Sequence, residues 1–452
     1  MSGELRREWW QPAVAADRHV VAAGTPALGQ ASSVSFWALI AFTIVLVLAP
    51  QDHLSFLKPL HLAMLSALAA GGSYVIDRYR GHCLRAPPSP EFLWLGAIVL
   101  WAIATLPFSL WPGGSYQTLT GLFLKAVVIF WLLARVVDSP ARLKTVAWLL
   151  SLAAVPLSLS AVKAFVASGG AQNPDLSLGL SRINGYEGGL TSNPNDLALM
   201  INLILPLTLG LVFCTRRWGL RFLLCGGAVL DAIAILATYS RGGFLMLATI
   251  VCSYLVVLCR RGRYFAVIAF LALGAATVPM LPSGYMQRLS TIVSIQNDQT
   301  NSAQDRWRDM KAAARYAFRH PVIGAGIGMS QLELNQVRGP EWVEVHNVYL
   351  KYAMELGWVG LALYLLLFGA ALRSTRRACL AAARAGEREL FFLAQAIGVS
   401  LVGFTVAAMF YPDAYEFYFF YFAGLAVAAR MIGLRAEAAI GANSRAREIA
   451  IR

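Results

Sequence analysis

Long apolar runs recur from one end of the chain to the other, and they constrain the fold more than any other feature. Twelve runs are long enough, or nearly long enough, to cross a bilayer as a helix, which takes about 20 apolar residues. They cover residues 36–50, 59–76, 92–106, 118–133, 143–165, 197–214, 222–238, 243–258, 265–281, 347–372, 390–410 and 417–432. With 58% hydrophobic and 14% charged residues, a soluble globule could not cover its surface with polar side chains. The sequence therefore predicts an all-α integral membrane protein with about twelve transmembrane helices.

The basic residues lie between the apolar runs rather than on a polar domain. The five connections assigned to one side carry seventeen of them: Arg78, Arg80, Arg85, Arg135, Arg142, Lys144, Arg216, Arg217, Arg221, Arg260, Arg261, Arg263, Arg373, Arg376, Arg377, Arg384 and Arg388. The four short connections on the other side carry Lys58 and Arg241 alone. Because positive residues accumulate on the cytoplasmic side, residues 1–34 and 434–452 are expected to be cytoplasmic tails of a transmembrane domain over residues 35–433. Topology thus explains the net charge of +14, and no nucleic acid partner is expected.

Two connections on the sparsely charged side are too long to be simple turns, residues 166–196 and residues 282–346. Long ordered loops on a compact scaffold often carry function, and we expect both loops in the periplasm. In the second loop, Ser302 and Asp305 form a helix-start pattern, and the helix is expected to run to about Arg319. The expected fold is therefore a helix bundle with a large periplasmic loop that contains short helices.

The helix predicted over residues 302–319 has an amphipathic pattern. Steps of three and four residues form one basic and one apolar stripe, which are Arg308, Lys311, Arg315 and Arg319, and Trp307, Met310, Ala314 and Phe318. Two interpretations stay open. The helix rests its apolar side on the domain, or it forms a basic lip that attracts phosphate-bearing lipids. In the second case Arg308 and Arg315 are candidate substrate contacts.

Two residues at the predicted outer surface are candidates for chemistry. His346 lies where the large loop meets the next apolar run, and a lone histidine is usually structural or solvated. Arg241 stands at the outer end of two spans joined by almost no loop, where a charge is costly unless it is paired. Its planar guanidinium suits a phosphate or a carboxylate, and the alternative is a side chain that snorkels to the interface.

Further polar candidates lie in the two long loops. Arg182 is in the first loop and Arg288 in the second, and each is either a substrate-binding or an ordinary interfacial arginine. Asn193 and Asn195 flank a proline in a pattern that most simply forms a turn and a helix cap. Ligand binding is the alternative for these two asparagines.

Charged residues also occur near or within the apolar runs. Lys125 and Asp231 are central in their runs and oppositely charged, so we expect a buried pair. Asp52 and His53 form the one acidic and histidine pair on the outer side, and they stay a minor candidate for a metal site.

The remaining patterns argue against a cofactor. The glycines between Gly324 and Gly328 follow no predicted strand, so a turn packed on the basic helix explains them better than a nucleotide site. The outer loops hold no D-x-D motif, and the six cysteines have no zinc spacing. Neither a metal nor an organic cofactor is expected.

Four segments together resemble the O-antigen ligase and polymerase superfamily of membrane glycosyltransferases. They are SRGG from Ser240, PVIGAGIG from Pro321, HNVYL from His346 and ELGWVG from Glu355, in this order. The resemblance covers roughly residues 179–368 and depends on the order of the segments more than on any single match.

This resemblance implies a metal-independent transferase that acts on an undecaprenyl-diphosphate-linked glycan. It implies a catalytic centre of His346, Arg288 and Arg241, with Arg182, Arg241 and Arg288 around the donor diphosphate. The expected reaction is ligation of O-antigen, with inversion, onto a sugar hydroxyl of the lipid A-core acceptor of lipopolysaccharide. The expected place is the bacterial inner membrane, among its lipids, with the active site on the periplasmic side. Because that compartment lacks ATP, the donor must carry its own activation, and clustered guanidinium groups stabilise a leaving diphosphate without a metal.

Three alternatives remain. Within the superfamily these are an O-antigen polymerase, which joins two lipid-linked glycans, and a protein O-oligosaccharyltransferase. From a different class comes a transporter of lipid-linked glycan. A transporter fits less well, because the two halves of the chain show no repeat and a long outer loop ending in a histidine is more natural for an enzyme.

Overall fold

The computed structural model describes residues 32–80, 89–170, 183, 186, 191, 193–277, 302–339 and 342–451. Within these ranges the chain is helical and contains no β-strand. Ten of the described helical segments are long and apolar enough to cross a membrane. They are Ser55–Tyr79, Pro90–Phe108, Pro112–Val136, Pro140–Ala167, Pro194–Cys214, Trp218–Ala237, Arg241–Arg260, Val348–Ala385, Arg388–Ala407 and Phe417–Gly441. The predicted all-α membrane architecture is confirmed.

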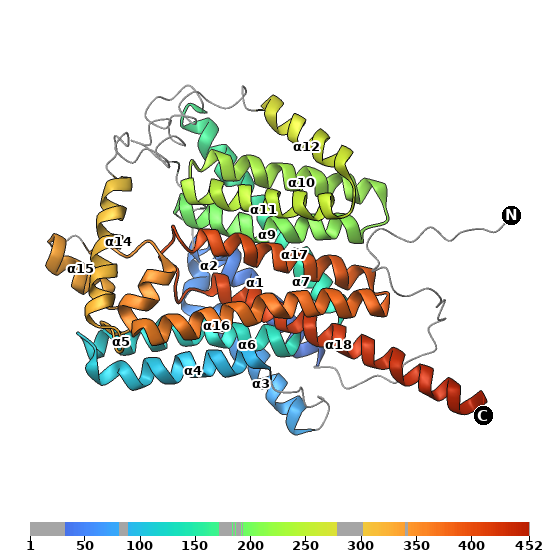
Figure 1. Ribbon diagram of the computed structural model, residues 1–452, viewed down its shortest axis with the longest axis horizontal. Coiled ribbons are helices and arrows are strands. Elements are labelled where there is room, and N and C mark those ends of the chain that lie inside the picture. Colours follow the sequence, from blue (N-terminus) through green and yellow to red (C-terminus); the bar gives the residue numbers. More distant parts are fainter. Residues whose placement is uncertain are drawn as a thin grey trace.

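Figure 1 shows the described helices in their order along the chain. The first part of the chain forms α1 (Ser33–Leu48), α2 (Pro50–His53), η1 (Ser55–Leu60), α3 (Leu62–Tyr79), α4 (Pro90–Thr105), η2 (Leu106–Phe108), α5 (Pro112–Thr118), η3 (Leu119–Phe123), α6 (Leu124–Val136) and α7 (Pro140–Ala167). The second part forms α9 (Pro194–Cys214), α10 (Trp218–Ala237), α11 (Arg241–Arg260), α12 (Tyr264–Thr277), α14 (Ser302–Arg319), α15 (Ser330–Arg338), α16 (Val348–Ala385), α17 (Arg388–Ala407) and α18 (Phe417–Ile451). Each of the twelve predicted runs coincides with helix, although α1 with 16 residues and α12 with 14 residues are shorter than the ten spans.

Local sequence explains where several of these helices begin. Proline is the first residue of α4, α5, α7 and α9, where its missing N–H costs nothing and its fixed φ suits the helix. The predicted helix over residues 302–319 is confirmed as α14. At the other end of the chain, α18 continues to Ile451 through the residues expected to form a tail.

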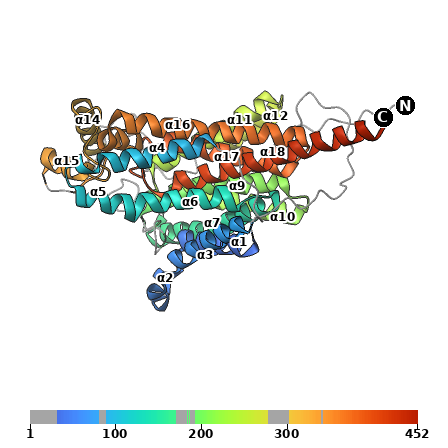
Figure 2. The same ribbon diagram turned by 90° about the horizontal axis from the view of Figure 1, so that it is seen from below.

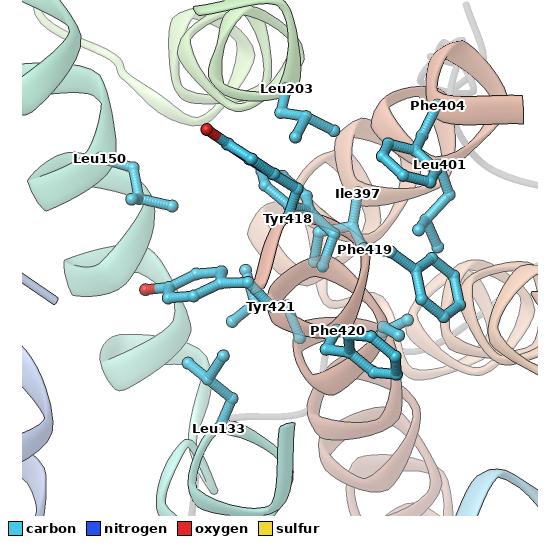
Figure 3. Packing of buried hydrophobic residues seen from close by; sticks show 14 of the residues in the cluster. Leu133, Leu150, Leu203, Ile397, Leu401, Phe404, Tyr418, Phe419, Phe420 and Tyr421 are labelled. Carbon is cyan, nitrogen blue, oxygen red and sulfur yellow. The ribbon is translucent and has the colours of Figure 1, made fainter. Parts of the chain in front are cut away.

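Among the ten spans, the one formed by α18 is the most completely buried, and Figure 3 shows the packing around its first turns. Its aromatic run of Tyr418, Phe419, Phe420 and Tyr421 is buried. These rings pack among aliphatic and aromatic side chains of α6, α7, α9 and α17, including Leu133, Leu150, Leu203, Ile397, Leu401 and Phe404. Helices at the periphery, such as α3, leave large apolar side chains exposed, as expected for surfaces that face lipid.

The two ends of the bundle differ in their loops. At one end, the segment 408–416 meets α11's start through the hydroxyls of Ser240 and Tyr411, 3.2 Å apart, and residues 106–112 meet residues 321–328. We call this the loop end. At the opposite, basic end, Lys144 contacts Glu389 at 2.6 Å, and Arg388 donates to the carbonyl of Phe213 at 3.2 Å. Figures 1 and 2 show α14 and α15 at the loop end and the last turns of α18 at the basic end.

α16 is broken one quarter of the way along its length. Gly357 has φ of 69° and ψ of −179°, a conformation that is essentially restricted to glycine. A Cβ there would overlap the carbonyl of Val322. The groups that the break frees find partners elsewhere, because the Trp358 amide donates to the Pro321 carbonyl at 2.8 Å and Trp101 Nε1 donates to the Leu356 carbonyl at 2.9 Å. The break thus seats residues 321–328 against the start of α16.

Candidate functional site

His346 lies at the loop end, two residues before α16 begins. Asn347 is the N-cap of α16, and its Oδ1 accepts from the Leu350 amide at 3.0 Å. The Val348 amide donates to the Ala408 carbonyl at 2.7 Å, at the end of α17. These bonds hold the residue before α16 in a defined place beside the segment 408–416.

The hydrogen bonds of His346 define its tautomer. Nδ1 lies 2.9 Å from the carbonyl oxygen of Glu344, and because a carbonyl can only accept, Nδ1 carries the proton. In the neutral ring, Nε2 is therefore the nitrogen with the free lone pair. His346 is thus arranged to accept a proton at Nε2.

Burial lowers the pKa of His346 to about 4, and the positive charge of Arg306 acts in the same direction. The Glu344 carbonyl and carboxylate oppose this shift, whereas the charge of Lys351 adds to it. The imidazole is consequently neutral throughout the physiological pH range.

An ion-pair network surrounds Glu344. Its carboxylate contacts Lys351 Nζ at 2.9 Å and accepts from Gln331 Nε2 at 2.8 Å. Lys351 also donates to the Pro412 carbonyl at 3.0 Å. Because the backbone carbonyl of Glu344 orients His346, this network links α15, α16 and the segment 408–416 to the imidazole.

A second carboxylate, Glu355, is completely buried on α16. It accepts from the amide of Gly328 at 2.7 Å and from the amide of Ser330 at 3.3 Å. Two more amides of the glycine-rich segment, those of Ala325 and Gly326, donate to α16 carbonyls at 2.8 Å. The segment is therefore anchored to α16 by backbone bonds at both edges of the break.

This anchoring revises the prediction that the glycine turn packs on the basic helix. Only Ala325 shares a hydrophobic cluster with α14. A Cβ at Gly324 would come within 2.6 Å of the α16 backbone, and one at Gly326 or Gly328 would overlap Ser109 or Thr118. The glycines let this segment approach α16 and the residues around α5 closely. The sequence alone did not identify these two neighbours.

Two further acidic residues lie in the segment 408–416. Burial raises the pKa of Asp413 well above its ordinary value, and the charges of Asp196 and Glu416 add to the shift. Burial also raises the pKa of Glu416. Asp413 Oδ2 has no hydrogen-bond partner among the described residues. Sequence reasoning missed these residues, and the available signal was two carboxylates between two long apolar runs.

Arg241 is the first residue of α11 and is partly buried. Its neighbour Ser240 caps the helix, because Ser240 Oγ accepts from the Gly243 amide at 3.2 Å. Ser240 also contacts Tyr411, and Val348 bonds to Ala408, so residues adjacent to both Arg241 and His346 are held against the segment 408–416. The structure therefore brings these two predicted residues to one end of the bundle. Arg182 and Arg288 lie outside the described residues.

The structure also shows the surroundings of the other predicted contacts. Asn193 is the N-cap of α9 and accepts from the amide of Asn195 at 2.9 Å, which matches the turn-and-cap interpretation. Arg308 is exposed and lies 3.5 Å from Asp305, and Arg315 is exposed as well.

The arginine of α14 whose charge reaches His346 is Arg306, which belongs to neither predicted stripe. The buried face of α14 consists of Asp309, Ala313, Tyr316 and Ala317. Arg306 precedes Asp309 by three residues, so it lies next to this face. Helical spacing from the buried residues could have identified it, but one of the two interpretations that the sequence left open placed the apolar stripe, and not this face, against the domain.

Two further predictions concern charged residues within or near the spans. The expected pair of Lys125 and Asp231 is wrong, because Lys125 is exposed and Asp231 is buried and accepts from Ser158 Oγ at 2.7 Å. A small hydroxyl on the neighbouring α7 meets the carboxylate. Near Asp52, the His53 ring packs edge-on against Tyr186 with centroids 5.0 Å apart, and no group of three possible metal ligands occurs among the described residues.

The segment that carries this geometry is also the segment that carries the family likeness. Residues 226–365 match the O-antigen ligase family. The match includes all four motifs, and the resemblance predicted from them is confirmed. It also includes Arg241, Arg306, Glu344 and His346, whereas Arg182 precedes it. No curated protein matches the chain. The O-antigen ligase match supports a ligase or polymerase type of function in a membrane that carries lipid-linked glycan.

Proposed function

We propose that the protein is an inverting, metal-independent glycosyltransferase that ligates O-antigen from undecaprenyl diphosphate onto a sugar hydroxyl of lipid A-core. The observation that carries the proposal is His346, a neutral imidazole with a defined tautomer inside the O-antigen ligase match. The concentration of basic residues at the opposite end supports a periplasmic site in the bacterial inner membrane with both termini in the cytoplasm.

The proposed chemistry uses His346 as a general base. The acceptor hydroxyl attacks the anomeric carbon while its proton moves to Nε2 of His346. The bond between the anomeric carbon and the diphosphate oxygen breaks, and the electron pair leaves with undecaprenyl diphosphate. A positioned imidazole typically contributes about 10²- to 10⁴-fold to such a transfer. Attack opposite the leaving group inverts the anomeric centre.

An imidazole with a low pKa is a weak base, and binding of the donor raises its basicity. The positive charge of Arg306 helps to keep the pKa of His346 low in the free protein. A bound diphosphate offsets that charge, so it raises the basicity of the imidazole when the acceptor is to be deprotonated. Binding of the donor therefore prepares the base for the reaction.

Arginines are proposed to stabilise the departing diphosphate. Arg241 stands at the start of α11, where backbone N–H groups also favour an anion. Arg306 joins it on the grounds of its electrostatic effect on His346 and Tyr411. Arg182 and Arg288 stay predictions from the sequence resemblance. Guanidinium groups in this arrangement would replace the metal that many other glycosyltransferases use.

Purified protein, given lipid-linked O-antigen and rough lipopolysaccharide, tests the proposal. His346→Ala should lose at least about 10²-fold in the rate of ligation. His320→Ala is the matched control, because His320 is an exposed histidine that stacks on Tyr316. Near-normal ligation by His346→Ala would remove the base assignment. Product from the donor alone, with no lipopolysaccharide present, would identify a polymerase instead.

Donor binding is tested separately from catalysis. Arg241→Ala should raise the KM for lipid-linked glycan or lower kcat, whereas Arg216→Ala, an exposed residue at the basic end, should do neither. Full activity in excess EDTA is expected. Labelling of a cysteine at position 346 from the cytoplasm alone would refute the proposed orientation.

A further inference from the structure

α14 presents an outer face of mixed aromatic and basic side chains. Trp307 is 47% exposed and Phe318 is 72% exposed, contrary to the interpretation that this stripe packs on the domain. Lys311 lies over the Trp307 ring, with Nζ 5.1 Å from its centroid, and Arg315 is exposed on the same side. The opposite face of the helix is buried on α15 and α16. Large aromatic side chains on the exposed face of a helix indicate an interaction surface.

The exposed aromatic face continues onto a membrane-spanning helix. The rings of Phe318 and Trp358 have centroids 5.2 Å apart. Trp358 is the first residue of α16 after the break at Gly357, and both Trp358 and the next residue, Val359, are partly exposed. Val322, between α14 and the break, is exposed too. One apolar patch therefore runs from α14 onto the beginning of a span.

The position of Trp358 indicates at which depth of the bilayer the apolar patch lies. Tryptophan at the end of a spanning helix is characteristic of the membrane–water interface. Figure 1 shows α14 running across the direction of the spans rather than along it. A helix in this orientation, in ring contact with an interfacial tryptophan, has its aromatic side chains at the depth of the lipid headgroups.

We infer that α14 docks on the bilayer surface and that its basic residues bind phosphate-bearing lipid headgroups. Trp307 and Phe318 insert between the lipids, as aromatic residues of interfacial helices do. Lys311 and Arg315 lie beside them and meet the phosphates, with an attraction that grows with the anionic lipid content. This docking holds the loop end against the membrane, independently of the sugar-transfer reaction proposed above.

Hydrogen exchange of the full-length protein in lipid nanodiscs tests this inference. Amides of α14 should exchange about tenfold more slowly in nanodiscs of phosphatidylcholine with phosphatidylglycerol than in phosphatidylcholine alone. A double variant, Lys311→Gln with Arg315→Gln, should abolish that difference. The matched control is Arg216→Gln with Arg217→Gln, which removes two exposed charges at the basic end and should keep the difference.

The aromatic contribution has its own variant. Trp307→Ala with Phe318→Ala should speed the exchange of α14 in both kinds of nanodisc, because insertion of the rings does not depend on lipid charge. Equal exchange of α14 in detergent with inorganic phosphate and in anionic nanodiscs would overturn the inference. Exchange that is unaffected by either double variant would overturn it as well.

Discussion

Acidification from pH 7.5 to pH 5.5 should leave kcat/KM for ligation almost unchanged if His346 is the base. The folded protein lowers the pKa of this imidazole to about 4. At pH 5.5 about 97% of such a group is neutral, compared with about 9% of a histidine that titrates at its ordinary pKa of 6.5. The two cases differ about tenfold in the concentration of the neutral base. An initial-rate assay resolves a difference of this size.

The assay measures initial rates at subsaturating donor between pH 4 and pH 8, since kcat/KM reports the free enzyme. Arg306→Gln provides the internal check. Removing its positive charge should raise the pKa of His346, so the acid limb of the profile should move to higher pH even if the plateau falls. A wild-type limb near pH 6.5, or one that Arg306→Gln does not move, would refute this account of the base.

The same shift predicts how stability depends on pH. The pKa of His346 is lower in the folded than in the unfolded chain, so the unfolded chain binds the proton more tightly. This contribution is present above pH 6.5 and is lost as the pH falls toward 4, by at most about 3 kcal/mol. His346→Gln should therefore lose less thermal stability than the wild type between pH 7 and pH 5. An equal loss would contradict the lowered pKa.

Substitutions at Gly357, Lys351 and Asp231, two of them with a matched control variant, test other parts of the structure. Gly357→Ala should destabilise the protein by about 2 to 5 kcal/mol, from the positive φ and the overlap with the neighbouring backbone, in a thermal melt in detergent. Gly369→Ala in the same helix has room for its methyl group and should melt at or above the wild-type temperature. Lys351→Met should lower kcat about 10²-fold with little change in KM, because it releases the network that orients the imidazole, and Lys351→Arg should recover part of the rate. A rise in KM with unchanged kcat would argue against this role. Asp231→Asn keeps the acceptor for Ser158, so a loss of transfer by a variant that melts near the wild-type temperature would show a function that the structure does not indicate.

Several local features could be predicted because their cause lies within a few residues. The apolar runs predicted the helices, since a bilayer requires backbone groups to bond within each segment. Ser302 and the polar residues that follow it predicted α14, and Asn193 predicted the cap of α9. The four motifs predicted the family, which the match over residues 226–365 bears out.

Which side of a helix is buried was harder to predict. In a membrane both the protein-facing and the lipid-facing sides are apolar, so hydrophobic period carries little information about packing. This explains why Lys125 was paired with Asp231, whose partner is Ser158. For α14 the sequence left two interpretations open, and the one that buries Trp307 and Phe318 is wrong, because both are exposed.

By itself, the sequence determined the membrane class, the apolar helices, the starts of α9 and α14 and the resemblance to the O-antigen ligase family, because these depend on composition and on neighbours along the chain. Tertiary structure alone decided the surroundings of His346. Lys351 contacts Glu344 across the start of α16, and the positive charge of Arg306 on α14 helps to lower the pKa of His346. The break at Gly357 makes room for residues 321–328, which connect α14 with α15. These contacts and charge effects come from the packing of segments that are distant in sequence. Desolvation and charge act through space, so they produce no periodic pattern in the sequence.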